Sequence, residues 1–394
     1  MENFKLKSFD GTELYCYLFD KVENPKGVVM VVHGMGEHMG RYIHFAEYLN
    51  SRGYIVFGDD HRGHGFSETD ADRGHHDGDM FSDTVKDEVF FLKYLEDRYK
   101  LPVLFFGHSY GSFLGQSFLE QGTDVSGVAL SGSGTMPDFV TGLGMGAAKF
   151  IMLFNKKTRM KILNFFGNLR DKMKYRGPED KGNKLWLTRD PAMRQVSRDD
   201  PYTSVPMSVS FCYYMLKGLR TAEKPENFKK VNVDTPIGLF SGSMDPIGGY
   251  GKSIVDLKNR YEKLGVTHLE FHLYKDARHE VLNELNRDEV MNDVANFFDK
   301  CVDIQNCLLC AWRDCACTDS CACNHRIRFR RQHKGGGRRR KRQRRHCRHD
   351  FGGGVPYDVV RGNGDFRVCD YRRVSAAFVP YRIRRILRAD LQQG

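Results

Sequence analysis

Apolar runs of strand length open the chain and set its folding pattern. Two extended stretches, Phe4–Phe9 and Glu13–Phe19, flank Asp10 and Gly11, and this pair predicts a hairpin because both residue types tolerate positive φ. The next run, Gly27–Val32, is continuously apolar, as a strand covered on both faces of a parallel sheet requires. We therefore expect an antiparallel edge followed by a central strand.

Amphipathic stretches then alternate with further apolar runs as far as residue 134. The predicted elements are a helix at Tyr42–Arg52, a strand at Tyr54–Gly58, a helix at Ser82–Tyr99, a strand at Val103–Phe106, a helix at Ser112–Gln121 and a strand at Gly127–Leu130. This alternation predicts right-handed βαβ units. The expected fold class is α/β, a mostly parallel sheet with helices on both faces.

The alternation breaks between residues 135 and 232, where the sequence predicts mostly helical structure. It resumes with a strand at Pro236–Phe240, a helix at Lys252–Leu264, a strand at Leu269–Tyr274 and a helix at Arg287–Val302. Parts of the predicted sheet thus stand on both sides of the break. We expect residues 135–232 to form a helical cap on one domain that spans residues 1–304.

Composition changes abruptly in the last part of the chain. Residues 305–394 hold 22 of the 61 lysines and arginines but 7 of the 50 acidic residues, so this tail carries +15 and the rest is slightly acidic. The tail contains no glutamate, and its apolar residues follow no sustained period. Such a change is typical of a disordered low-complexity extension or of translation in an unintended reading frame. We expect this basic Cys/Arg-rich tail to bind polyanions non-specifically and in a salt-dependent way.

Two further hypotheses concern the tail. Its cysteines suggest zinc, but the C-x-x-C that begins at Cys307 has no second C-x-x-C to complete a site. The cysteines that precede His325 in this stretch are Cys307, Cys310, Cys315, Cys317, Cys321 and Cys323. The basic run Arg338–Arg345 suggests nucleic-acid binding or nuclear localisation, an alternative to an enzyme that the sequence leaves open.

The rest of the chain has little cysteine and no targeting signal. Only Cys16 and Cys212 precede residue 300, so no disulfide framework is expected. The N-terminus lacks the apolar segment of a signal peptide, and no run of about 18 apolar residues occurs. The expectation is a cytoplasmic protein with at most peripheral contact with a membrane.

The candidate nucleophile lies between a predicted strand and a predicted helix. Residues 107–111, Gly-His-Ser-Tyr-Gly, fit the pattern G-x-S-x-G around Ser109. Glycines on both sides let the chain make the sharp turn that lifts the serine hydroxyl out of the sheet. Without this strand and helix the motif is a common glycine-rich turn; with them it predicts a nucleophilic serine.

A serine hydroxyl needs a base, and the base needs an acid to orient it, in the chain order Ser, Asp, His. Asp245 follows the strand ending at Phe240, where active-site residues of parallel sheets collect. Asp234 and Asp276 are weaker alternatives, because one precedes the strand and the other lies too close to the histidine. Asp245 is the predicted acid.

The predicted base is His279, which follows the last predicted strand. It would take the proton from Ser109 and return it to the leaving alcohol, while Asp245 fixes its tautomer. His268 and His272 lie before or within that strand, where a structural histidine is the better interpretation.

Acyl transfer also needs donors for the oxyanion, usually the N–H after the nucleophile and one from an early strand-to-helix loop. We assign the backbone N–H groups of Met35 and Tyr110 to this hole. His33 is expected to organise the loop, and Glu37 with Arg41 to form a helix-start ion pair.

A histidine-rich loop, Asp59–Ser67, follows the next strand. A metal site is one interpretation, but no acidic or cysteine partner lies at ligand spacing within a plausible site. Loop packing is therefore preferred, and neither a metal nor a cofactor is expected.

Taken together, these motifs resemble the monoacylglycerol lipase and lysophospholipase branch of the α/β-hydrolases, also classified as the serine aminopeptidase type. The residues that carry the resemblance are residues 33–38 with Arg41 and Tyr42, residues 60–67, residues 107–111, Asp245 with Pro246, and residues 277–280. Motifs in the correct order over residues 33–280 are more specific than any one of them.

The resemblance implies hydrolysis of one acyl ester of a monoacylglycerol or lysophospholipid, no cofactor, and a cap that forms an acyl tunnel. The apolar stretch Thr141–Phe154 suits a tunnel lining or contact with a bilayer, and an ordinary core helix of the cap is the alternative. A serine aminopeptidase stays open as well, if Glu179 or Asp180 faces a free α-amino group. Nothing in this family accounts for the tail.

Overall fold

The computed structural model describes residues 1–160, 174–177, 180–181, 183–312, 345–347 and 357–359. The chain divides into two compact units, residues 1–306 and 307–394. In the second unit the described strands are β9 (Arg345–Cys347) and β10 (Tyr357–Val359), which pair antiparallel. Of the cysteines in the zinc hypothesis, Cys307 and Cys310 lie on α10 (Arg287–Trp312), and those at 315–323 lie outside the described residues. Residues 338–344, the larger part of the basic run in the nucleic-acid hypothesis, also lie outside them.

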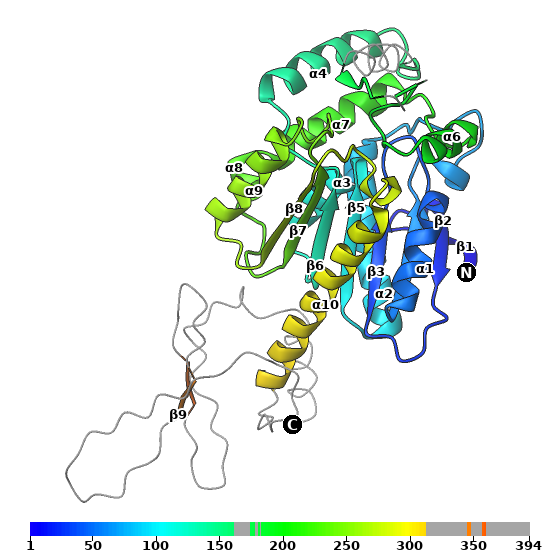
Figure 1. Ribbon diagram of the computed structural model, residues 1–394. Helices are drawn as coiled ribbons and strands as arrows, with labels where there is room; N and C mark the ends of the chain where they lie inside the picture. Colours follow the sequence, from blue (N-terminus) through cyan, green and yellow to red (C-terminus); the bar gives the residue numbers. More distant parts are fainter. Residues whose placement is uncertain (161–173, 178–179, 182, 313–344, 348–356, 360–394) are drawn as a thin grey trace, which may run out of the picture. The chain divides into compact units, whose positions relative to one another are not determined.

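One sheet of eight strands forms the framework of the first unit, in the order β1-β2-β4-β3-β5-β6-β7-β8 (Figure 1). The strands are β1 (Glu2–Lys7), β2 (Glu13–Phe19), β3 (Gly27–Val32), β4 (Tyr54–Asp60), β5 (Val103–His108), β6 (Gly127–Ser131), β7 (Ile237–Gly242) and β8 (Leu269–Tyr274). β1, β2 and β4 pair antiparallel, and the pairs from β4 to β8 are parallel. The expected α/β class and mostly parallel sheet are confirmed.

Helices follow β3 and each later strand of this sheet. The α-helices are α1 (Ile43–Ser51), α2 (Met80–Tyr99), α3 (Tyr110–Leu119), α4 (Asp138–Met152), α6 (Pro191–Asp199), α7 (Val209–Ala222), α8 (Pro225–Phe228), α9 (Lys252–Leu264) and α10 (Arg287–Trp312). Short 3-10 turns form η1 (Met39–Tyr42), η2 (Gly65–Ser67) and η3 (Val281–Asn283). Helix α2 begins before the predicted Ser82 because Asp79 caps it, accepting a hydrogen bond from the Ser82 N–H.

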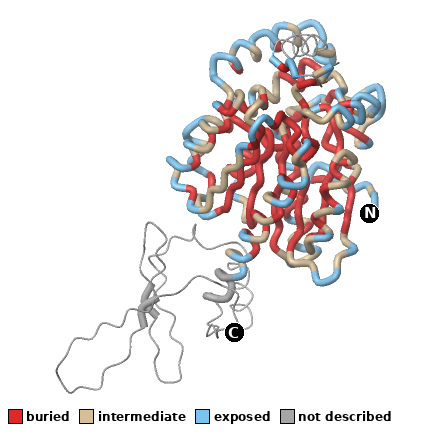
Figure 2. The backbone as a smooth tube through the Cα atoms, in the orientation of Figure 1, coloured by how far each residue is buried: buried red, intermediate tan, exposed pale blue. Residues whose placement is uncertain are grey.

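The continuous apolar run of β3 is explained by burial on both faces of the sheet. Val28 and Met30 pack in a core with side chains of α2, α3 and α9. Val29 and Val31, which point the other way, pack in a second core with side chains of α1 and α10. Figure 2 shows the resulting buried strands at the centre of the fold. A strand between two helical layers has no polar face, so alternation is absent from its sequence.

Two details differ from the sequence-based expectations. In the β1–β2 loop only Gly11 takes a positive φ, 86°, and Asp10 does not. The pairing of Lys7 with Glu13 leaves a loop from Ser8 to Thr12, so the turn is longer than a two-residue hairpin. Helix α10 also continues beyond the predicted end at Val302.

The segment between β6 and β7 supplies α4, α6, α7 and α8. Figure 1 shows α4 and α7 stacked at one end of the sheet, the end where β5 gives way to α3. α4 packs on α7, and α7 packs on α2 and α3. The helices of this segment thus cover the end of the sheet that carries the candidate nucleophile.

Candidate functional site

Ser109 occupies the turn between β5 and α3 with φ 53° and ψ −115°, an unfavourable conformation for a residue that has a Cβ. The flanking glycines explain how the turn is reached. A Cβ on Gly107 would lie 2.4 Å from the Gly111 carbonyl oxygen, and one on Gly111 would lie 2.0 Å from the Val32 carbonyl oxygen. The G-x-S-x-G pattern is therefore a steric requirement of this turn, which leaves Ser109 partly exposed.

Asp245 and His279 come together at the same end of the sheet. The His279 Nδ1 lies 3.0 Å from each carboxylate oxygen of Asp245, and both side chains are buried. Burial acts to lower the pKa of His279, but the negative charge of Asp245 outweighs it, so the pKa is raised above its usual 6.5. The imidazolium form of His279 is thus stabilised at this position.

The alternative acids and bases lie elsewhere. Asp234 and Asp276 are exposed, and His272 pairs with Glu270 and Asp293 on the β8 side of the sheet. His268 immediately precedes β8.

The Nε2 atom of His279 is buried and has no hydrogen-bond partner among the residues that the structure describes. The bond from the Ser109 hydroxyl to this atom is not formed in the structure. In enzymes without substrate such bonds are often long and tighten only in the complex. The unpaired Nε2 atom is the one that could accept a proton from a serine hydroxyl.

The loop that follows β3 passes directly against Ser109. A Cβ on Gly34 would lie 3.3 Å from the Ser109 Cβ, and the Gly34 N–H donates to Glu37 Oε1 at 2.5 Å. Glu37 also accepts a hydrogen bond from Tyr42 and one from Arg41. The pair of Glu37 with Arg41 is therefore more than the expected helix-start contact, because it holds the backbone beside the serine.

The two residues assigned as oxyanion donors are next in sequence to Gly34 and Ser109, which approach each other here. Met35 follows Gly34 in the loop, and Tyr110 is the first residue of α3. The N–H groups of a first helical turn have no carbonyl partner within the helix, and the helix dipole favours negative charge there.

His61 packs against His33 in the loop that follows β3. Its ring stacks on the His33 ring at 3.8 Å, its Nε2 lies 3.3 Å from the His33 carbonyl oxygen, and its N–H donates to His33 Nε2. Burial and the neighbouring histidines lower the pKa of His33, which is therefore neutral. His33 organises the loop, as the sequence suggested.

The expectation that no acidic partner approaches the histidine-rich loop is wrong. Asp59 Oδ2 lies 3.1 Å and Glu88 Oε1 3.5 Å from His61 Nδ1, and all three side chains are buried. Glu88 lies on α2, far from the loop in sequence, so residue spacing could not predict this contact. These residues have ligand atoms that could hold a metal ion. Burial and the charge of Asp59 raise the pKa of Glu88 well above its usual value, which favours a neutral Glu88 in the absence of a metal ion.

A segment of the β6–β7 insertion clamps the loop that carries His279, and no sequence motif marks this contact. The Arg278 guanidinium donates to the Leu185 carbonyl at 2.7 Å, and the Glu280 N–H donates to the Leu187 carbonyl at 2.7 Å. Arg278 also pairs with Asp180, which is therefore not a free carboxylate for an α-amino group. Glu179 lies outside the described residues.

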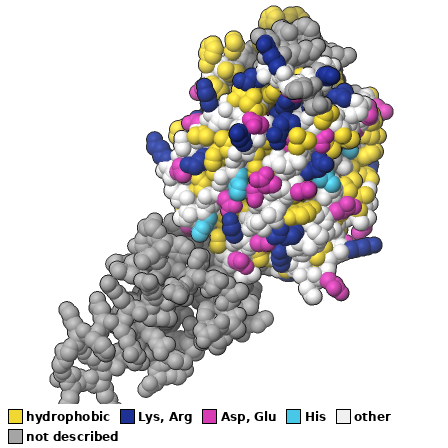
Figure 3. Space-filling model, viewed as in Figure 1, with side chains coloured by type: hydrophobic (Ala, Val, Ile, Leu, Met, Phe, Trp, Pro, Cys, Tyr) yellow, Lys and Arg dark blue, Asp and Glu magenta, His cyan; other side chains and the backbone are white. Residues whose placement is uncertain are grey.

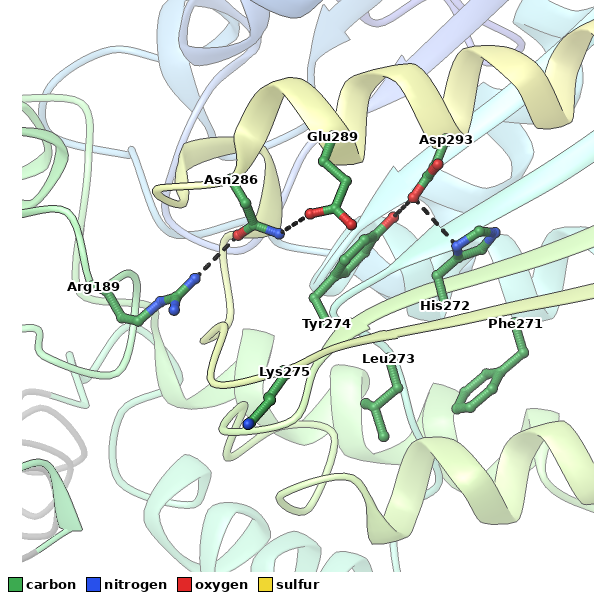
Figure 4. A pocket seen from close by; sticks show the side chains of 9 residues that line it. All are labelled: Arg189, Phe271, His272, Leu273, Tyr274, Lys275, Asn286, Glu289 and Asp293. Atoms are coloured by element: carbon green, nitrogen blue, oxygen red, sulfur yellow. Dashed lines mark hydrogen bonds and ion pairs between the residues drawn. The ribbon is translucent and has the colours of Figure 1, made fainter.

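A hollow of about 540 Å³ lies apart from these groups, along β8 and the start of α10 (Figure 4). It is lined by Arg189, Phe271, His272, Leu273, Tyr274, Lys275, Asn286, Glu289 and Asp293. None of the predicted catalytic residues lines it, so it is separate from the candidate site.

A strained serine turn after β5 and an Asp–His pair after β7 and β8, on a mostly parallel sheet, are the arrangement of an α/β-hydrolase. Residues 23–286 match the protein family described as serine aminopeptidase, S33, and the chain belongs to this family. It is an enzyme of the serine hydrolase class.

Several named lipases and esterases are similar in sequence or structure to this chain. The monoglyceride lipase of Saccharomyces cerevisiae is 27% identical over 74% of this chain and 90% of its own length. A monoglyceride lipase homolog of Monkeypox virus is 36% identical, over 27% of this chain and 37% of its own length. Among solved structures, a thermostable carboxyl esterase from Bacillus coagulans aligns with a TM-score of 0.68 at 27% identity, over 76% of this chain and 98% of that one.

Proposed function

We propose that this protein is a carboxylic ester hydrolase that cleaves the acyl ester of a monoacylglycerol. The observation that carries the proposal is the buried hydrogen-bonded pair of Asp245 and His279 at the same end of the sheet as the strained Ser109 turn. The relatives support the substrate class, since they include proteins named as monoglyceride lipases. Lysophospholipid, which also carries a single acyl ester, is the second substrate to test.

The proposed reaction proceeds through a seryl acyl-enzyme. His279 Nε2 takes the proton of the Ser109 hydroxyl as Oγ attacks the ester carbonyl carbon. The N–H groups of Met35 and Tyr110 bind the oxyanion of the tetrahedral intermediate. The intermediate collapses, and the glycerol oxygen leaves with the proton from His279. Water, deprotonated by His279, then attacks the acyl-serine; the bond from the carbonyl carbon to Ser109 Oγ breaks, His279 returns the proton to Oγ, and the fatty acid leaves. Asp245 stabilises the imidazolium of His279 in both half-reactions. The reaction uses no cofactor.

The deciding experiment compares wild type, Ser109→Ala and the control Ser117→Ala, a serine on the same helix α3. Each is assayed on a monoacylglycerol, a lysophosphatidylcholine and an aminoacyl anilide. Monoacylglycerol turnover that Ser109→Ala abolishes and Ser117→Ala retains supports the proposal. Cleavage of the anilide alone assigns an aminopeptidase, and ester turnover that survives Ser109→Ala overturns the mechanism.

We also propose that α4 and the residues after it contact a lipid surface. Only Thr141 and Ala148 of α4 are buried, so the alternative of an ordinary core helix is not supported. The exposed apolar side chains are Phe139, Val140, Leu143, Phe150, Leu153 and Phe154. Figure 3 shows hydrophobic side chains at the top of the molecule, the end at which Figure 1 places α4. Among the described helices, none combines the length and apolar composition needed to cross a bilayer.

Sedimentation with phosphatidylcholine vesicles tests this surface. The double variant Phe139→Ser/Phe154→Ser removes two of the most exposed aromatic side chains, each 78% exposed. Phe9→Ser, at an exposed phenylalanine far from α4 in the chain, is the matched control. We expect the double variant alone to lose vesicle binding, and equal binding by all three proteins would exclude α4 as the contact.

The tail is proposed to bind polyanions through its net charge of +15 rather than to confer the enzymatic activity. Deletion of residues 305–394 separates the two roles. The truncated chain should keep its esterase turnover and lose salt-sensitive retention on heparin. Loss of turnover in the truncated chain, or retention on heparin that the deletion leaves unchanged, would contradict this division.

A further inference from the structure

Trp186 lies against the ring of His279. The two ring centroids are 4.9 Å apart and the planes are tilted by 35°. Trp186 comes from the insertion between β6 and β7, whereas His279 follows β8. An indole side chain is thus placed on the predicted general base by a part of the chain that no catalytic motif includes.

The backbone around Trp186 is fixed to the loop of His279 by a series of hydrogen bonds. The His279 N–H donates to the Trp186 carbonyl at 3.2 Å. Four further bonds join the same two segments: Arg278 to the Leu185 carbonyl, the Glu280 N–H to the Leu187 carbonyl, Thr188 to the Asn283 carbonyl, and the Arg189 N–H to Glu284. The indole is therefore held beside the imidazole by bonds on both sides of it in sequence.

Other groups around the His279 ring are already accounted for. Asp245 binds Nδ1, and the charges of Glu280 and Glu37 act from a greater distance. The His108 ring lies at 4.8 Å, and burial together with the charge of His279 lowers the pKa of His108 to about 4, so it is neutral. Beside Gly132 there is no room for a side chain, since a Cβ there would lie 2.9 Å from the His279 ring.

We propose that Trp186 is a positioning residue of the hydrolytic reaction, whose indole holds the His279 ring and stabilises its imidazolium form. This inference rests on the proposed function. An aromatic ring attracts a cation within about 6 Å of its centroid, and tryptophan does so most strongly. In the reaction the neutral His279 ring gains positive charge when it takes the serine proton, so the contact strengthens toward the transition state and acts on kcat.

The kinetic test uses Trp186→Leu, which keeps an apolar side chain without a ring, and Trp186→Phe, which keeps a ring. kcat/KM for a monoacylglycerol is measured against pH. We expect Trp186→Leu to lower the plateau by about 3- to 30-fold and to move the acidic limb to lower pH by about half a unit or more. Trp186→Phe should restore most of both. Unchanged acidic limbs in both variants would overturn the role.

Fluorescence gives a second readout that needs no turnover. The chain has two tryptophans, so Trp312→Phe leaves Trp186 as the sole indole. We expect its emission to fall as His279 becomes protonated, with a midpoint equal to that of the kinetic acidic limb, and His279→Gln to remove the transition. A transition that persists in His279→Gln, or none in the parent, contradicts the contact. Activity that survives Ser109→Ala would instead defeat the proposed function and leave this result standing.

Discussion

Arg41 donates two hydrogen bonds, each 2.8 Å, to the carboxylate of Glu280, which is 239 positions along the chain. The same guanidinium binds Glu37, whose other oxygen holds the Gly34 N–H beside Ser109. Arg41 thereby joins the loop after β3, which lies against Ser109, to the loop that carries His279. Burial opposes ionisation of Glu280, but the charge of Arg41 outweighs it and lowers the pKa of Glu280 to about 2.

Substitution Arg41→Met should therefore leave two buried carboxylates without a counter-charge. We expect the free energy of unfolding to fall by about 3–5 kcal/mol near neutral pH, and kcat to fall because Gly34 loses its support. Urea unfolding and ester hydrolysis measure the two effects. Arg41→Lys keeps the charge without the bidentate geometry and should lie between. If Arg41→Met kept the wild-type free energy of unfolding, the ion pairs of Arg41 would make no net contribution to stability.

Substitution Asp245→Asn should lower kcat by about a thousandfold or more, because the imidazole loses the partner that fixes its tautomer and stabilises its charge. Wild-type activity should fall as the pH drops through the raised pKa of His279, since only the neutral ring accepts a proton. The asparagine removes the charge that raises this pKa, so the residual activity should persist to lower pH. Asp234→Asn and Asp276→Asn are the controls; a comparable loss in either would transfer the acid's role.

Substitution Gly111→Ala tests the steric origin of the motif. Its Cβ would lie 2.0 Å from the backbone oxygen of Val32, which cannot move without distorting β3. We expect a loss of at least about 3 kcal/mol in the free energy of unfolding, read by thermal denaturation. Gly146→Ala, in α4 with no atom within 4 Å of the added Cβ, should be neutral or stabilising. Equal melting temperatures for the two variants would refute the steric argument.

Substitution Arg62→Met tests a buried ion pair on the antiparallel side of the sheet. Arg62 donates to both oxygens of Asp87 at 2.6 and 2.7 Å, and both side chains are buried. The unpaired Asp87 should cost about 3–5 kcal/mol, and Arg62→Met/Asp87→Leu should recover much of it. Lys258→Met breaks the i,i+4 pair with Glu262 on α9 and should cost at most about 0.5 kcal/mol. A double variant no more stable than the single one would exclude the buried charge as the cause.

Most of the sheet was predictable because its signals are local. The strands Glu13–Phe19, Gly27–Val32 and Leu269–Tyr274 match the predicted ranges. Gly27–Val32 is continuously apolar because both its faces are covered, whereas Leu269–Tyr274, half-buried at the edge of the sheet, alternates apolar and polar residues. Helix α9 also matches, because Gly251 and Gly265 adopt positive φ at its two ends.

The sequence by itself determined the turn at Ser109, since G-x-S-x-G stands between an apolar strand run and a helix, and a Cβ on Gly107 would meet the Gly111 carbonyl of the same turn. The contact of Gly111 with the Val32 carbonyl, by contrast, is made by the neighbouring strand β3. Only the tertiary structure decided which distant groups meet there. Glu88 beside His61, Glu280 beside Arg41 and Trp186 beside His279 are brought together by the packing of separate elements. An apolar or charged residue reveals its own preference for burial or pairing, but its partner is chosen by the path of the whole chain. The outward face of α4 was undecided for the same reason, because apolar residues at helical spacing suit a core and a lipid surface equally.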